Sequence, residues 1–366
     1  MTIANPASLG ENPLTTGIGS LPHHNIDAAL EFSFRFDIPF LPQIPIRNPW
    51  EYMIPHALEG LPGLMVNREG EALLRVDVWK SQSHLLDARL ENELKSPSRS
   101  GAPSSFEPSA PTSSSWQPFI WEIAERKAGI AKIQIAGPMT AQWALQLSDG
   151  SKIDRHPELA SQIFRLVTAR ALAMARRLRE AGAQPLLFID EPGLFGLDPQ
   201  NPRHQMGLQE LKLMLQILRK NRVFVGLHCC SDTAWSAVLQ LPLDFLSIDT
   251  HLSLGSILKS AESRQQLETF LRSGGRLSLG VIPTGIQTES FGELSGQNLF
   301  QELEETLTQS MMKQSSLTAV ETRTWIQQLL RQSLYTPACG LGMLGTETAE
   351  RVQELLFEFK RKLPKD

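Results

Sequence analysis

Short apolar runs rich in β-branched and aromatic residues recur along the chain, and most of them are followed by a stretch with helical periodicity. This alternation is typical of βα units, in which each strand is followed by a helix that packs back on the sheet. Eight strands are predicted, at residues 16–20, 38–44, 130–136, 185–190, 222–228, 243–249, 276–281 and 333–338.

Two helices are indicated by the spacing of their apolar positions. One has Leu159, Ile163, Leu166, Met174 and Leu178 on a single face and is expected to stop at Gly182. The last helix repeats the pattern with Val352, Leu355, Leu356 and Phe359. In a chain of 366 residues, this alternation favours an α/β fold with a single (β/α)8 TIM barrel over residues 1–366, rather than an open doubly wound sheet.

One segment interrupts the alternation. Residues 96–115 are dominated by Ser and Pro, and such a composition buries too little apolar surface to offset the entropy lost on ordering. We therefore expect a flexible insertion there.

Composition and charge restrict the class of partner. Hydrophobic residues make up 41% of the chain, enough for a large core without disulfides. The net charge is −4 and no dense run of Lys and Arg occurs, so we expect neither nucleic acid nor a membrane as partner. No secretory signal is recognised at the N-terminus, and the three cysteines suit a reducing compartment. A cytoplasmic protein is therefore predicted.

The strongest local signal for chemistry lies at the end of the predicted strand 222–228. Side chains alternate along a strand, so His228 and Cys230 share a face while Cys229 points away and is expected to pack in the core. Cys339 follows the last predicted strand, and Asp249 ends the strand after that of His228. Two thiolates, an imidazole and a carboxylate suit a tetrahedral Zn²⁺ site. The alternative is that these cysteines are ordinary buried residues and the histidine a satisfied polar group.

Other polar residues follow other predicted strands. In a barrel of this type the carboxyl ends of the strands build the site, so Gly19, Ser20 and Asp190 are expected to converge there. Glu191 faces the opposite way from Asp190, and we expect it to form a salt bridge with a neighbouring loop. Trp143 either forms a wall of the site or packs within its helix, and we expect packing.

Six motifs in order along the chain resemble one family: IGSLPH, GPMT, IDEPG, LHCC, LSID and TPACG. Together they resemble the catalytic barrel of cobalamin-independent methionine synthase and its shorter relatives in the uroporphyrinogen decarboxylase/methionine synthase superfamily. The resemblance implies a zinc enzyme with His228, Cys230 and Cys339 as metal ligands and Asp249 where the family has a glutamate. It also implies that Ser20 and Asp190 bind the amino-acid end of homocysteine, and we add Ile18 and Gly19 to this substrate-binding set. No catalytic side chain is assigned.

Departures from the family pattern bear on the methyl donor. Asp249 is one methylene shorter than glutamate, so it is the weakest of the four expected ligands. The segment after Gly280 carries neither the Asp nor the His that full-length methionine synthases have there, and the chain is about half as long as the two-barrel enzyme. The resemblance therefore implies a methylcorrinoid protein or another carrier as donor, rather than polyglutamyl methylfolate.

The function predicted from the sequence is methyl transfer to a zinc-bound thiol, homocysteine or a similar small molecule. Coordination to zinc deprotonates a thiol whose free pKa is near 8.5, and so supplies the thiolate nucleophile. Two alternatives stay open. One is a metal-free decarboxylase like the porphyrinogen-processing branch of the superfamily, and the other is a non-catalytic protein that binds zinc or a corrinoid partner.

Overall fold

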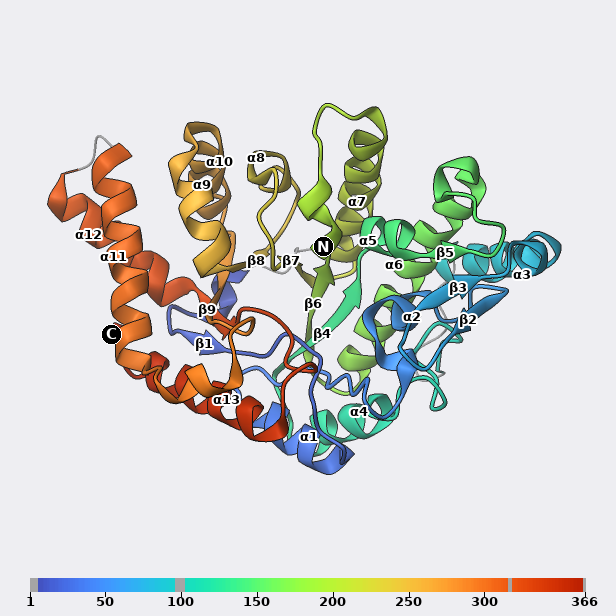
Figure 1. The fold of residues 1–366 in the computed structure, drawn as a ribbon, viewed down its shortest axis with the longest axis horizontal. Coiled ribbons are helices and arrows are strands. Elements are labelled where there is room, and N and C mark those ends of the chain that lie inside the picture. Colours follow the sequence, from blue (N-terminus) through green and yellow to red (C-terminus); the bar gives the residue numbers. More distant parts are fainter. Residues whose placement is uncertain (1–5, 96–102, 315–317, 365–366) are drawn as a thin grey trace.

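The computed structural model describes residues 6–95, 103–314 and 318–364. Its centre is a curled, all-parallel sheet of seven strands in the order β1-β10-β9-β8-β7-β6-β4 (Figure 1). The strands are β1 (Leu14–Thr15), β4 (Ile130–Ala136), β6 (Gln184–Asp190), β7 (Phe224–Cys229), β8 (Phe245–Asp249), β9 (Arg276–Ile282) and β10 (Leu334–Pro337). Six of the eight expected strands are therefore present, with ends shifted by two residues at most.

The first two expected strands differ from the prediction. In place of the strand 16–20 the structure has β1 at Leu14–Thr15 and a single isolated bridge at Ser20. The segment 38–44 forms isolated parallel bridges instead of a ladder, with Gln43 opposite Ser20 and Phe40 opposite Lys132. Two prolines, Pro39 and Pro42, interrupt its sequence and Pro45 follows it, and proline has no N–H to donate to a ladder. The structure thus shows a curled seven-stranded sheet, which is compatible with the predicted barrel without showing its closure.

Helices cover the outer face of the curled sheet (Figure 1). They are α1 (Ile26–Phe34), α2 (Met53–Leu58), α3 (Val76–Lys95), α4 (Trp116–Glu125), α5 (Pro138–Ala144), α6 (Pro157–Glu180), α7 (Pro202–Lys220), α8 (Trp235–Val238), α9 (Gly255–Lys259), α10 (Ala261–Arg272), α11 (Gly296–Gln314), α12 (Ala319–Gln332) and α13 (Thr346–Lys360). Both predicted helices are confirmed, as α6 and α13. After α6 the chain turns at Gly182, whose φ of +95° suits glycine. Within the described ranges, no helix combines the length and apolar character needed to cross a membrane.

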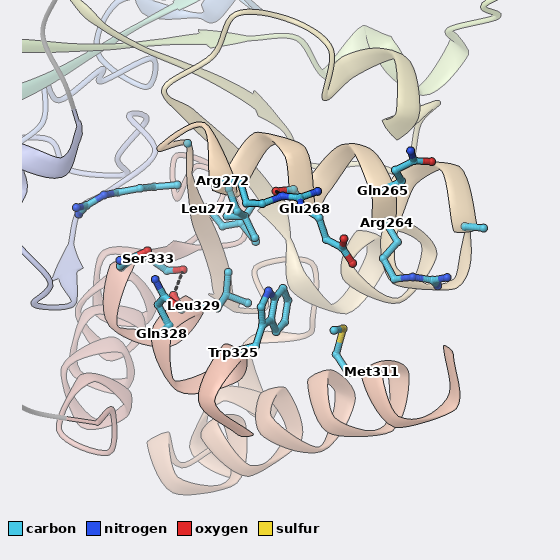
Figure 2. Close-up of a pocket in the computed structure, with 15 residues that line it drawn as sticks. Arg264, Gln265, Glu268, Arg272, Leu277, Met311, Trp325, Gln328, Leu329 and Ser333 are labelled. Carbon is cyan, nitrogen blue, oxygen red and sulfur yellow. Dashed lines mark hydrogen bonds between the residues drawn. The ribbon is translucent and has the colours of Figure 1, made fainter. Parts of the chain in front are cut away.

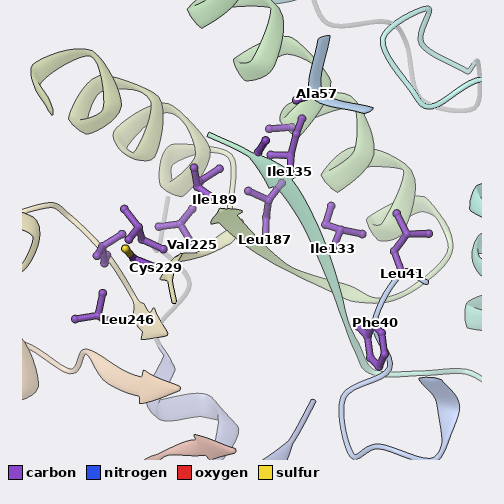
Figure 3. Packing of buried hydrophobic residues seen from close by; sticks show 14 of the residues in the cluster. Phe40, Leu41, Ala57, Ile133, Ile135, Leu187, Ile189, Val225, Cys229 and Leu246 are labelled. Carbon is purple, nitrogen blue, oxygen red and sulfur yellow. The ribbon is translucent and has the colours of Figure 1, made fainter. Parts of the chain in front are cut away.

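The sheet separates two apolar layers. Residues such as Leu187, Val225 and Leu246 point outward and pack with the helices in the main core (Figure 3). The inner face carries a smaller cluster made of Ile38, Leu186, Phe188, Phe224, Phe245 and Leu334. Because side chains alternate along each strand, the polar residues that share the inner face are gathered inside the curl, above this cluster.

Two short segments add to this architecture. Strands β2 (Leu64–Val66), β3 (Ala72–Leu74) and β5 (Gln146–Leu147) form a small second sheet that the sequence analysis missed, because each strand is too short to show an alternation. Of the segment 96–115, residues 96–102 lie outside the described residues. The remainder is packed against the body, with Phe106 and Ser115 buried and the Ser115 hydroxyl donating to the carbonyl of Pro42.

Candidate metal centre

Three side chains that are distant in sequence meet at the carboxyl ends of the strands. His228 and Cys230 stand at the end of β7, and Cys339 follows β10. One ligand atom from each of the three lies within 4.8 Å of the others, so together they could hold a metal ion. Strands β8 and β9 separate β7 from β10 in the sheet, and the curl of the sheet therefore brings the two ends together. The register of β10 also shifts between Thr336 and Pro337, a bulge that re-aims the chain just before Cys339.

The imidazole of His228 is oriented by the next strand. Its Nδ1 lies 2.9 Å from the Oγ of Ser247, the residue opposite it on β8. Its Nε2 is buried, and in the described part of the chain that atom has no hydrogen-bond partner. A histidine that ligates a metal uses one nitrogen for the ion and is oriented through the other, and His228 has this arrangement. The residues present therefore fit a metal ion.

The two cysteines of the group influence each other's protonation in opposite directions. A hydrogen bond from the Cys230 thiol, assisted by the nearby imidazole of His228, lowers the pKa of the Cys339 thiol to about 4 despite its burial. The same bond, together with burial, raises the pKa of Cys230. Both residues are half-buried free cysteines. A thiolate is thus already stabilised at Cys339, and thiolate is the form in which cysteine binds a metal.

The remaining cysteine lies on the other face, as predicted. Cys229 is fully buried in the main core beside Val225 (Figure 3), and its thiol donates to the carbonyl of Ser231 at 3.4 Å. Burial raises its pKa. It is a packing residue and a natural control for the other two cysteines.

Asp249 is not part of the group that the structure brings together. Its Oδ1 accepts hydrogen bonds from the backbone N–H groups of His251 and Leu252, at 2.9 and 3.3 Å, and so caps the turn that follows β8. One carboxylate oxygen is therefore committed to the backbone. Its role as a fourth ligand stays a prediction.

Asp190 lies beside His228 at the end of the adjacent strand, β6. It is 9% exposed, and among the described residues no partner bonds its Oδ1. Burial raises its pKa to about 6, although His228 and Lys132 act in the opposite direction. Above that pH the side chain presents a carboxylate oxygen that is free to accept a hydrogen bond from a cationic group.

Residues 18–20 run past the inner side of this site. The carbonyl of Ile18 accepts a hydrogen bond from Lys132 at 2.5 Å, and the Oγ of Ser20 accepts one from the N–H of Gly342 at 3.3 Å. Gly19 packs on Gln134, because an added Cβ would lie 2.6 Å from that side chain. The expected substrate-binding segment therefore contacts the loop that carries Cys339, while its role in binding stays a prediction.

Glu191 holds a neighbouring loop, but through hydrogen bonds and not through the salt bridge that we expected. Its fully buried carboxyl accepts from the N–H groups of Met139 and Thr140, at 3.1 and 2.7 Å, and from the Thr140 hydroxyl at 2.6 Å. Gly137 permits this approach, since a Cβ there would lie 2.0 Å from the carboxyl oxygen. Glu191 thus caps the start of α5.

The Glu191 carboxyl predicts a pH dependence of stability. Burial raises its pKa to about 7 from 4.5, so its contribution to folding is complete below pH 4.5 and is lost as the pH rises through 7. Between about pH 5 and pH 8, the free energy of unfolding of the metal-free protein should fall by up to about 3 kcal/mol relative to Glu191→Gln. Chemical denaturation of both proteins across this range measures the difference. Parallel pH profiles for the two proteins would contradict the prediction.

A cleft of about 1200 Å³ reaches the metal group from outside. Its lining includes Cys230, Trp143 on α5, His204 on α7 and Phe195 in the turn after β6. Trp143 is 40% exposed and its ring lies 5.0 Å from that of His204, so it forms a wall of the cleft and is not the simple packing residue that we expected. A second cavity, of about 550 Å³, lies between α10, α11 and α12 and contains none of the predicted site residues (Figure 2).

Sequence reasoning missed three residues that support the site: Lys132, Gln134 and Ser247. The signal for Lys132 and Gln134 was present in the strand sequence IAKIQIA, where they occupy alternate positions of an otherwise apolar run, and Ser247 is likewise the one hydroxyl in the run FLSI of β8. Alternate polar positions in a buried strand indicate that the inner face is polar at that level.

No family model matches the chain, and no curated protein matches it in sequence. Among solved structures, a match was found to a B12-independent methionine synthase from Shewanella sp. W3-18-1 in complex with selenomethionine. The two chains are 13% identical, and the TM-score is 0.42. The match covers 66% of this chain and 65% of that one, slightly less than two thirds of its length.

Proposed function

We propose that this protein is a zinc-dependent methyltransferase that methylates the sulfur of a small thiol, homocysteine or a close analogue. The observation that carries the proposal is the approach of ligand atoms from His228, Cys230 and Cys339 to within 4.8 Å of one another. The ordered motifs of the sequence support it independently, because they resemble methionine synthases over the same residues.

Zinc bound at this group would hold an incoming thiol as its thiolate at neutral pH, so that no protein base is needed. The chain contributes the ligands and fixes their orientation. Ser247 would orient the imidazole of His228 through Nδ1 and so leave the unpartnered Nε2 for the metal, while the register shift in β10 lies just before Cys339. Three protein ligands leave a coordination position for substrate, which is the pattern of catalytic zinc sites.

The inner rim of the site would bind the amino-acid end of the thiol. Asp190 is adjacent to His228 and offers an unpartnered carboxylate oxygen to an ammonium group. Residues 18–20, which contact the loop after Cys339 through Ser20, would hold the carboxylate, with the Ser20 hydroxyl as donor. Holding both ends would orient the sulfur for in-line attack on the methyl carbon.

The cleft beside Cys230 would admit the methyl donor, for which we propose a methylcorrinoid or another carrier. With a methylcorrinoid as donor the transfer would be heterolytic: the sulfur electron pair would form the new C–S bond, and the electron pair of the broken carbon–cobalt bond would stay on the corrinoid. The thiol proton is released to solvent.

Two further proposals concern location and fold. Free cysteines suit a reducing compartment, so we propose a cytoplasmic location. We also propose that residues 38–44 close the sheet into a barrel through their isolated bridges.

The test is turnover of homocysteine with methylcobalamin by zinc-loaded protein, followed as methionine formed. We expect turnover with the unaltered chain and with Cys229→Ser, and a loss of at least about 100-fold with Cys339→Ser, because a ligand is removed. Metal-loaded protein that binds homocysteine but transfers no methyl group from any corrinoid donor would instead support a non-catalytic binding protein.

A further inference from the structure

A lysine is buried inside the curled sheet, below the metal centre. Lys132 lies on β4, where its neighbours Ala131 and Ile133 point outward into the main core, so its own side chain points inward. It is 2% exposed. Burying an ammonium group destabilises the fold unless hydrogen bonds and a nearby opposite charge replace its hydration. The partners of Lys132 therefore indicate its role.

The ammonium of Lys132 joins three elements. Its Nζ donates to the carbonyl of Ile18 at 2.5 Å and to the Oε1 of Gln134 at 3.2 Å, and it lies 5.1 Å above the centre of the Phe188 ring. The acidic group that acts on it is Asp190, which opposes the lowering of its pKa by burial to about 8. Lys132 thus ties residues 18–20 to β4 and β6.

Residues 18–20 in turn hold the loop that carries Cys339. The carbonyl of Ser20 accepts from the N–H of Leu341 at 2.9 Å, and its Oγ accepts from the N–H of Gly342 at 3.3 Å. The contact is close, because a Cβ added at Gly340 would lie 2.2 Å from the Ser20 Oγ. A displacement of residues 18–20 relative to the sheet would therefore also displace the residues that directly follow Cys339.

We propose that Lys132 is a positioning residue of the metal centre, which fixes residues 18–20 against the sheet and, through Ser20, sets the position of the Cys339 thiol relative to His228 and Cys230. This inference rests on the proposed function, since it requires that the three side chains bind metal. Lys132 touches none of the three in this role. It acts through the Ile18 carbonyl and the Ser20 contacts.

The test measures binding of Co²⁺ alone to the metal-free protein, because cobalt–thiolate absorption reports how many sulfurs bind. Lys132→Met keeps an unbranched side chain that is only one atom shorter and removes its charge and donors. We expect about 10- to 100-fold weaker Co²⁺ binding and a loss of cobalt–thiolate absorption, the usual range when support behind a ligand is removed. The control Trp79→Phe removes another buried hydrogen bond, to Gln162 between α3 and α6, and should leave both readouts unchanged.

The possible results separate the two proposals. If the unaltered chain binds no Co²⁺, the metal centre and this inference both fail. If the unaltered chain binds Co²⁺ and Lys132→Met has the same affinity and the same spectrum, only the inference about Lys132 is overturned. The inference is also overturned if Trp79→Phe weakens Co²⁺ binding as much as Lys132→Met does. Should Lys132→Met not fold, Lys132→Gln keeps a polar end but is too short to keep the bond to the Ile18 carbonyl. Weaker Co²⁺ binding in Lys132→Gln supports the linkage, and unchanged binding overturns it.

Discussion

Replacing either Cys230 or Cys339 with serine is expected to abolish stable zinc binding. The unaltered protein should contain about one zinc ion per chain, held by three side chains, and two remaining protein ligands are too few for a tight site. Because the thiolate is the ligand and the serine hydroxyl stays protonated at neutral pH, serine preserves shape without replacing the bond. Elemental analysis of the purified, dialysed proteins measures the metal directly.

Cys229→Ser provides the matched control. Cys229 is next to Cys230 in sequence but buried on the opposite face, so this variant should keep its zinc even if its stability falls. Zinc retained by Cys230→Ser or by Cys339→Ser would remove that residue from the site. Zinc lost equally from all three variants would indicate general damage to the fold.

Asp190→Asn is expected to weaken binding of thiols that carry an ammonium group, and to do so selectively. The Oδ1 of Asp190 is buried and has no partner in the described residues, so a bound ammonium would form a desolvated charge pair with it. Removing one charge from such a pair costs about 2 kcal/mol or more, which is roughly a 30-fold loss of affinity. Calorimetric titration of the zinc-loaded proteins with homocysteine, well above pH 6 where Asp190 is ionised, measures this loss.

The control ligand for Asp190 is 4-mercaptobutanoate, which is homocysteine without its amino group. It should bind the unaltered protein and Asp190→Asn with similar affinity, because Asp190 has no ammonium to contact in either case. An equal loss of affinity for both thiols would show that the substitution disturbs His228, its neighbour in the sheet, and would contradict a role in recognising the amino group.

The strands and the local pairing of His228 with Cys230 could be predicted from sequence, because both depend on the two-residue period of a strand. That period also placed Cys229 in the core. The same reasoning overestimated residues 38–44, where prolines leave bridges in place of a strand. It also considered Trp143 and Glu191 without their neighbours in space. Trp143 lies against His204 of α7, and Glu191 accepts hydrogen bonds from the start of α5.

The amino-acid sequence by itself determined the repeated βα pattern, the shared face of His228 and Cys230 and the polar positions of β4, since these follow from nearest-neighbour geometry of the backbone. Only the tertiary structure decided that Cys339, 109 residues beyond Cys230, reaches the same point, and that Lys132 stands beneath Ile18. The physical reason is that the curl of the sheet and the bulge in β10 arise from the packing of all strands and helices together, and no local period encodes them.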